Sequence, residues 1–190
     1  MTALWAPWDG PQTKQPRSRA EVIAMLGDPT GGGKFTQTEK PDPAWIKAQT
    51  VELHSERAFL PVLAGRFVRV HKLVEPYMRE AFRRADISCP GYVKKAGVLV
   101  FRHMRHDPKM PLSLHSWGCA VDINSDANFA KTFPRGQEPK PWTPAWWAVW
   151  PQGMPEGVVL AFESCGFNWG GRWPEFVDPM HFQWQGHADV

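Results

Sequence analysis

A carboxylate inside an apolar run is the feature that most constrains this fold. Residues 113–124 read SLHSWGCAVDIN, and Asp122 stands there among alanine, valine and isoleucine. Burial removes the hydration of a carboxylate, so such a group needs a hydrogen-bonding partner or a metal ion. Residues seven apart on one strand point to opposite faces. Gly118 can turn the chain between His115 and Asp122, so that a loop histidine and a strand aspartate converge.

The C-terminal stretch VDPMHFQW supplies a third candidate ligand. His181 begins an alternating segment, which places His181 and Gln183 on the same face. Pro179 favours an extended conformation for Asp178. These residues predict a turn that leads into a strand, not the helical HExxH arrangement of other zinc enzymes. A catalytic zinc site takes three protein ligands and keeps one position open for water. Asp178, three residues before His181, is placed to act as a general base beside such a site.

Length and composition favour one mixed domain. The chain has 190 residues, enough to bury a sizeable core. Its 11 tryptophans and 19 prolines favour fixed turns over a helical bundle. Short strands and helices alternate without a βαβ rhythm, which predicts an α+β fold. We expect an N-terminal arm and short helix over residues 1–50 and a catalytic domain over residues 51–190, within a single globular unit.

Charge and cysteine usage exclude several classes of protein. The net charge of +3 is too small for nucleic-acid binding, which calls for a basic stripe with interleaved aromatic residues. No apolar run is long enough to span a bilayer, so we expect no membrane partner. The three cysteines form no CxxC motif, and Cys119 is expected to be a core thiol in a reducing compartment. Residues 1–20 lack the apolar core of a secretory signal, which favours cytoplasmic synthesis. We expect a monomer.

Local signals predict the regular elements. Ser18 and Glu21 have capping-box spacing and predict a short helix that ends at Gly27. A strand is predicted at residues 67–70, followed by a helix over residues 73–85. Further strands are predicted at residues 96–104 and 118–124, and a short helix from residue 158 that ends near Gly166. The apolar face of the helix over residues 73–85 is predicted to comprise Leu73, Tyr77, Met78, Ala81 and Phe82.

Several other motifs favour structural interpretations. The stretch GDPTGGGKF lacks the residues of a phosphate loop and is interpreted as a turn. His71 is expected to be structural, His103 and His106 exposed, and His187 unconstrained. The tryptophans of PWTPAWWAVWP have helical spacing, which favours a core-facing helix or flap over a wall of a substrate cleft; they are Trp142, Trp146, Trp147 and Trp150.

The motifs together resemble the zinc D,D-peptidases and L-alanyl-D-glutamate peptidases of peptidase family M15, which cut peptidoglycan stem peptides. The resemblance spans roughly residues 66–184. The stretch after residue 168 also looks like the corresponding part of phage-type members. The family pattern S-x-H-x-x-G-x-A-x-D followed by acid-x-x-H is matched at Ser113, His115, Gly118, Ala120, Asp122, Asp178 and His181, and the phage-type stretch at Trp169, Gly170, Gly171 and Trp173.

This resemblance implies a small antiparallel sheet flanked by helices, with a Hedgehog/D,D-peptidase-like zinc site. One zinc ion per chain would be held by His115, Asp122 and His181, and Asp178 would be the catalytic base. An arginine upstream of the first motif would hold substrate charge and the developing oxyanion. We expect Arg102 to be that arginine, with Arg105 as the weaker candidate. Ser113 is expected to order the ligand loop or to contact substrate, and Trp117 to line the site.

The implied activity is that of a zinc metallopeptidase acting on peptidoglycan peptides. We expect a phage-type endolysin that cleaves between L-Ala and D-Glu and reaches the wall through a membrane pore. A D-alanyl-D-alanine carboxypeptidase is the alternative. A catalytically silent wall-binding module is a third interpretation, which is disfavoured because all three ligands and the base are present.

Overall fold

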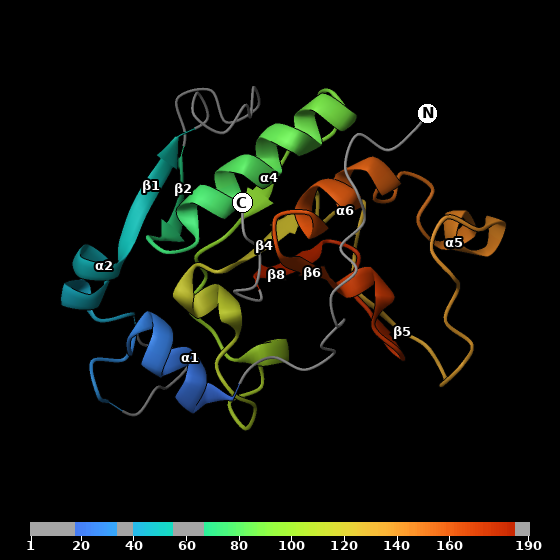
Figure 1. Cartoon of the computed structure of the whole chain (residues 1–190). Helices are drawn as coiled ribbons and strands as arrows, with labels where there is room; N and C mark the ends of the chain where they lie inside the picture. The colour runs from blue at the N-terminus through green and yellow to red at the C-terminus, as the bar shows by residue number, and fades with distance from the viewer. Residues whose placement is uncertain (1–17, 34–39, 55–66, 185–190) are drawn as a thin grey trace.

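The computed structural model describes residues 18–33, 40–54 and 67–184 (Figure 1). Over these residues the protein is a mixed structure of short helices and small antiparallel sheets, as the sequence predicts. The Hedgehog-like description and the division at residue 50 stay predictions. The predicted N-terminal arm and His187 lie outside the described residues. Within the described ranges, the structure holds no helix of the length and apolarity that a bilayer crossing requires.

A four-stranded antiparallel sheet forms the centre of the molecule. Its strands lie in the order β3 (Ala96–Gly97), β4 (Ala120–Ile123), β8 (His181–Trp184) and β6 (Phe167–Trp169). The register of β4 and β8 places Asp122 directly opposite His181. Directly opposed residues of antiparallel strands project from the same face. The pairing of two central strands therefore brings the strand aspartate to the C-terminal histidine.

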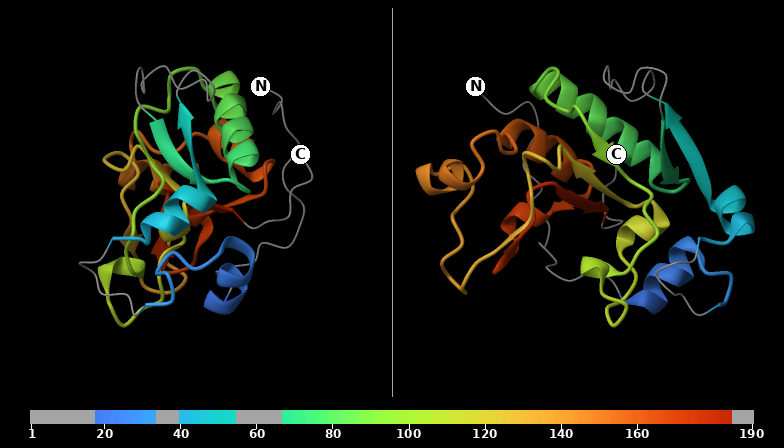
Figure 2. Two further views of the ribbon diagram at one scale, coloured as in Figure 1. Left: turned by 90° about the vertical axis from the view of Figure 1, so that its left-hand side faces the viewer. Right: turned by 180° about the vertical axis from the view of Figure 1, so that it is seen from behind.

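Two helices cover the other face of this sheet. In both figures α4 (Glu75–Ser88) and α6 (Glu156–Glu163) lie side by side across the sheet (Figures 1 and 2). Phe162 of α6 contacts Phe82 of α4, with ring centroids 5.3 Å apart, and Phe182 of β8, at 4.5 Å. Because strand side chains alternate, the burial of Phe182 under α6 leaves His181 and Gln183 on the opposite face, as predicted.

The N-terminal part of the described chain packs beside this unit. Helix α1 (Arg19–Leu26) begins at the predicted capping box and ends at Gly27. Helix α2 (Pro43–Gln49) leads directly into β1 (Thr50–His54), which pairs antiparallel with β2 (Phe67–His71). Helix α4 follows, with Pro76 in its first turn and its predicted apolar face buried except at two positions. Tyr77 is half-buried, and Leu73 precedes the helix and is 51% exposed, so its assignment to that face is wrong.

The predicted strand over residues 96–104 is wrong beyond Gly97. The backbone groups that a longer strand would use are bound by a nearby 3-10 helix, η3 (Leu114–Trp117). Val98 offers its carbonyl to the His115 ring at 2.7 Å, and the Val100 N–H donates to the His115 carbonyl at 3.2 Å. Two further 3-10 turns, η2 (Met104–His106) and η4 (Gly170–Arg172), flank the site.

The Trp-rich segment forms a core-facing helix, as predicted. Helix α5 (Pro144–Val149) buries Trp146, and Trp150 just after it is also fully buried. Trp147 faces outward and is 37% exposed. Two short strands, β5 (Lys131–Thr132) and β7 (Phe176–Val177), pair antiparallel near this end of the molecule. The three cysteines are free thiols, and Cys119 is fully buried as expected.

Candidate metal centre

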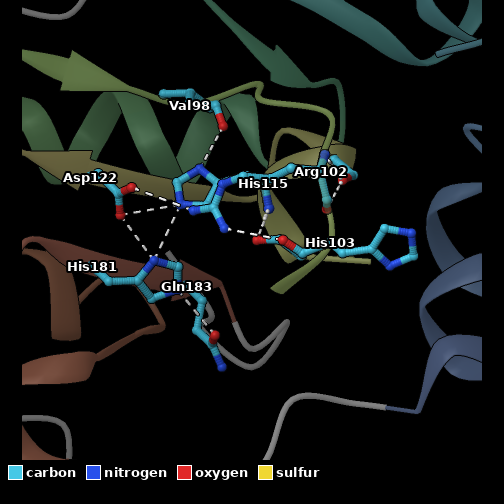
Figure 3. A network of polar contacts seen from close by, with 9 residues as sticks. Val98, Arg102, His103, His115, Asp122, His181 and Gln183 are labelled. Atoms are coloured by element: carbon cyan, nitrogen blue, oxygen red, sulfur yellow. Dashed lines mark hydrogen bonds and ion pairs between the residues drawn. The ribbon is translucent and has the colours of Figure 1, made fainter. Parts of the chain in front are cut away.

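The three predicted ligands converge on one point (Figure 3). His115 Nε2 lies 3.1 Å from Asp122 Oδ1 and 3.2 Å from His181 Nδ1, and His181 Nδ1 lies 3.0 Å from the same carboxylate oxygen. Ligand atoms 2.0–2.1 Å from a tetrahedral ion lie roughly 3.3 Å apart. The donor set of two imidazoles and a carboxylate, at this spacing, fits a zinc ion.

The outer ring nitrogens of both histidines are bound to carbonyl-type oxygens, which only accept hydrogen bonds. His115 Nδ1 lies 2.7 Å from the carbonyl oxygen of Val98, and His181 Nε2 lies 3.2 Å from Oε1 of Gln183. A proton on each outer nitrogen leaves the inner nitrogen with a lone pair toward Asp122. Three acceptor atoms then face one another, and a cation is the group that satisfies all three.

Electrostatics in the metal-free protein agree with this geometry. Burial lowers the pKa of His115 despite the nearby carboxylate of Asp122. Burial alone would raise the pKa of Asp122, but hydrogen bonds and charge from the two histidines hold it well below its usual range. Burial opposes protonation of His181, yet its hydrogen bond to Asp122 raises its pKa. A metal ion that binds at this point therefore competes with a proton for the His181 nitrogen.

The loop that carries His115 is built by its own sequence. The Ser113 hydroxyl accepts a hydrogen bond from the His115 N–H at 3.4 Å and caps η3. Gly118 ends η3 in the left-handed conformation with φ of 67°, and a Cβ there would lie 3.0 Å from the backbone nitrogen of His71. Ser113 is therefore placed to order the ligand loop.

Asp178 lies beside the ligands as a buried carboxyl group. Its Oδ1 atom is buried and has no hydrogen-bond partner among the described residues. Burial raises the pKa of Asp178 to about 6, with the Asp122 charge adding to the rise and those of His181 and Arg102 opposing it. Such a carboxyl can both accept and release a proton near neutral pH.

The turn that presents Asp178 is held by the tryptophan and glycine of the second motif. The Asp178 N–H donates to the carbonyl of Gly170 at 3.0 Å. The Trp169 indole donates to the carbonyl of Pro179 at 2.8 Å. A Cβ on Gly170 would lie 2.6 Å from the carbonyl oxygen of Asp178, so the close approach requires glycine. The phage-like stretch therefore shapes the position of both Asp178 and His181.

Of the two candidate arginines, Arg102 faces the site. Its Nη2 lies 3.9 Å from Asp122 Oδ2, and the side chain is 21% exposed. The buried Ser116 hydroxyl accepts from the Arg102 N–H at 3.1 Å and donates to its carbonyl at 3.0 Å. Arg105 is exposed and lies over the ring of Phe176, 4.5 Å from its centroid.

Of the other predicted residues, Trp117 and His103 differ from the expectation, whereas His106 and His71 agree with it. Trp117 is 1% exposed and donates its indole N–H to the carbonyl of Gly27, so this position does not support a direct substrate contact. His103 is 8% exposed, which corrects the expectation of solvent exposure: its Nδ1 lies 2.5 Å from the carbonyl of Met110. His106 is exposed, as predicted. His71 is buried and structural, also as predicted, with its ring against the carbonyl of Leu26.

Sequence reasoning missed the residues that orient the ligands. Gln183 was placed on the His181 face without a role, and Ser116 and the Val98 carbonyl were not singled out. Alternation along β8 was the available signal for Gln183. Trp173, whose ring centroid lies 5.3 Å from that of His181, also adjoins the site.

Two histidines, an aspartate, a buried carboxyl group and an arginine are the groups that the site of a metal-dependent hydrolase requires. Residues 106–184 match a family model described as D-alanyl-D-alanine carboxypeptidase, and this segment contains every ligand and Asp178. The match covers less than half of the chain; over this segment the protein is similar to the M15 zinc peptidases, and the similarity supports a zinc peptidase that acts on peptidoglycan. No curated protein and no solved structure matches the chain.

Proposed function

We propose that this chain is a zinc endopeptidase that cleaves between L-Ala and D-Glu in peptidoglycan stem peptides, in the manner of a phage-type endolysin. The observation that carries hydrolysis is the convergence of His115, Asp122 and His181 beside the Asp178 carboxyl. The phage-like stretch that holds Asp178 in its turn supports the endolysin type over other members of the family.

The residues of the site have distinct roles in this proposal. Zinc held by the three ligands would supply Lewis-acid polarisation of a water molecule and of the scissile carbonyl. Asp178 accepts a proton as that water attacks the carbonyl carbon, and it returns the proton to the nitrogen as the C–N bond breaks. The Arg102 guanidinium, near Asp122, donates hydrogen bonds to the negative charge that develops on the carbonyl oxygen.

A D-alanyl-D-alanine carboxypeptidase is the second candidate, and the description of the matching family model favours it. The two reactions use the same groups and differ only in the peptide bond that is presented to them. A carboxypeptidase must bind the terminal carboxylate of its substrate, whereas the endopeptidase binds a chain that continues on both sides.

Mass spectrometry of digested peptidoglycan distinguishes the two reactions. Purified walls are incubated with the zinc-loaded protein and, as control, with the Asp178→Ala variant. New amino termini on D-Glu are the expected result. Release of D-Ala alone would assign the carboxypeptidase instead. Equal product from the wild type and the variant on several wall types would contradict catalysis at this site.

The lytic role has its own test. Cells that express the protein in the cytoplasm should lyse only when a pore-forming protein is expressed with it, while purified protein should clear bare walls without one. Turbidity measurements on both preparations check this. Rapid lysis of intact cells without a pore would contradict the proposed route to the wall.

A further inference from the structure

The C-terminal end of α1 is held by three buried ring nitrogens from three separate parts of the chain. Trp45 Nε1 of α2 and His71 Nε2 of β2 each lie 3.1 Å from the carbonyl oxygen of Leu26. Trp117 Nε1 of η3 lies 2.8 Å from the carbonyl oxygen of Gly27. The last carbonyl groups of a helix have no partner within the helix and carry its negative partial charge. These ring N–H groups therefore complete the end of α1.

Trp117 makes this end of α1 a neighbour of the metal centre. It is the last residue of η3, two positions after His115, and it is 1% exposed. Helix η3 spans only residues 114–117, so the anchored indole and the ligand imidazole belong to one turn of chain. Figures 1 and 2 show α1 beside the segment that carries η3.

A second hydrogen bond connects the ligand loop to β2, whose last residue, His71, also contacts α1. The backbone N–H of His71 donates to the carbonyl of Gly118, directly after η3, at 3.1 Å. His71 thus contacts α1 through its ring and the ligand loop through its backbone. The end of α1 is therefore connected to η3 in two ways, directly through Trp117 and indirectly through His71 at the end of β2. Trp45, by contrast, reaches α1 from α2.

We propose that residues 18–33 belong to the catalytic unit, and that Trp117 is a positioning residue that fixes His115 through its hydrogen bond to Gly27. This inference rests on the proposed function, because it takes His115 as a metal ligand. Residues 18–33 lie outside the segment 106–184 that matches the family model.

Two matched variants test the role. Trp117→Phe and Trp45→Phe each remove one indole N–H that bonds to the end of α1, from side chains that are 1% and 6% exposed. Zinc affinity is measured by titrating the metal-free proteins against a chromophoric chelator. Trp117→Phe should weaken zinc binding about 3- to 10-fold, below the 10–100-fold typical of groups that bond a ligand directly. Trp45→Phe should retain wild-type affinity. Unchanged affinity in both variants, or equal weakening in both, would overturn the proposal.

Hydrogen exchange of the wild-type chain tests it without a substitution. Coupling between two sites is reciprocal, so zinc should slow amide exchange in α1 as well as in η3, and leave α5 unchanged. Protection of η3 with no change in α1 would overturn the positioning role while leaving the proposed function intact. A wild-type chain that bound no zinc would contradict the proposed function and this role with it.

Discussion

At the scale of single residues, the two aspartates of the site have opposite environments. Asp122 Oδ1 lies 3.0 and 3.1 Å from one ring nitrogen of each of the two imidazoles, which hold the pKa of Asp122 below its usual range despite burial. Asp178 is buried with Oδ1 unpartnered among the described residues, and burial raises its pKa to about 6. The first environment suits a metal ligand, and the second suits a group that exchanges protons.

Asp178→Asn should stabilise the metal-free protein at pH 7.5 and abolish hydrolysis. The pKa of Asp178 rises on folding from 3.8 to about 6, so the folded state binds this proton more tightly than the unfolded state. Ionisation of Asp178 therefore lowers the free energy of unfolding, by on the order of 1–3 kcal/mol. This loss is complete above pH 6 and absent at pH values well below 4. Urea unfolding at a series of pH values checks this. A variant that is less stable than the wild type at pH 7.5 would contradict it.

Gly118→Ala should destabilise the protein by about 1–3 kcal/mol. The residue has φ of 67°, and the new Cβ would lie 3.0 Å from the His71 nitrogen and 3.2 Å from the Val70 Cα. Gly97→Ala is the matched control, since a Cβ there meets nothing within 4 Å. Urea unfolding of the two variants should separate them clearly. Equal stabilities would show that the contact of η3 with β2 is not tight.

At the scale of elements, η3 determines the structure of the segment before it. Residues 98–102 have strand-like composition, yet their backbone groups bond to His115 and Ser116. Local β-propensity predicted a strand there, because propensity depends on side-chain type and does not show which groups hydrogen-bond to the backbone. Motif spacing predicted the three candidate ligands, and the structure brings them together. The Val98 carbonyl that orients His115 depends on contacts made only in the folded chain.

Ser116→Ala should reduce kcat/KM about 10-fold and leave zinc affinity within about 2-fold, by the loss of one buried pair of hydrogen bonds. The Ser116 hydroxyl bonds both backbone groups of Arg102, at 3.1 and 3.0 Å, and so fixes the arginine beside Asp122. In an Arg102→Ala background the same change should have little further effect. Additive losses in this double-mutant cycle would contradict the role.

At the scale of the whole molecule, strand register unites parts of the site that are distant in sequence. Asp122 and His181 are separated by 59 positions and become opposed by the pairing of β4 with β8. The sequence predicted both strands but not their register, which depends on the packing of Phe182 against α6. The burial of Trp117 against α1 was missed for a similar reason, because residues 18–33 carried no motif that linked them to the ligand loop.

Metal removal should lower the melting temperature of the protein by about 10 °C. A ligand present at a thousand times its Kd stabilises the folded state by about 4 kcal/mol, and each kcal/mol corresponds to about 2–4 °C for a chain of this size. Differential scanning calorimetry with and without a chelator checks this. Asp122→Asn, which removes a ligand charge, should show almost no chelator effect. An unchanged melting temperature for the wild type would contradict a structural contribution of the metal.

A calorimetric titration of the metal-free protein with zinc, compared with the Asp122→Asn variant, tests most directly whether the three candidate ligands form a zinc site. His115, Asp122 and His181 form the one group of metal-ligating side chains found within the described residues. We expect one zinc ion per wild-type chain and at least about 100-fold weaker binding in the variant, because a charged ligand is lost. A wild-type chain that binds no zinc, or a variant that binds zinc equally well, would show that these residues do not form a zinc site.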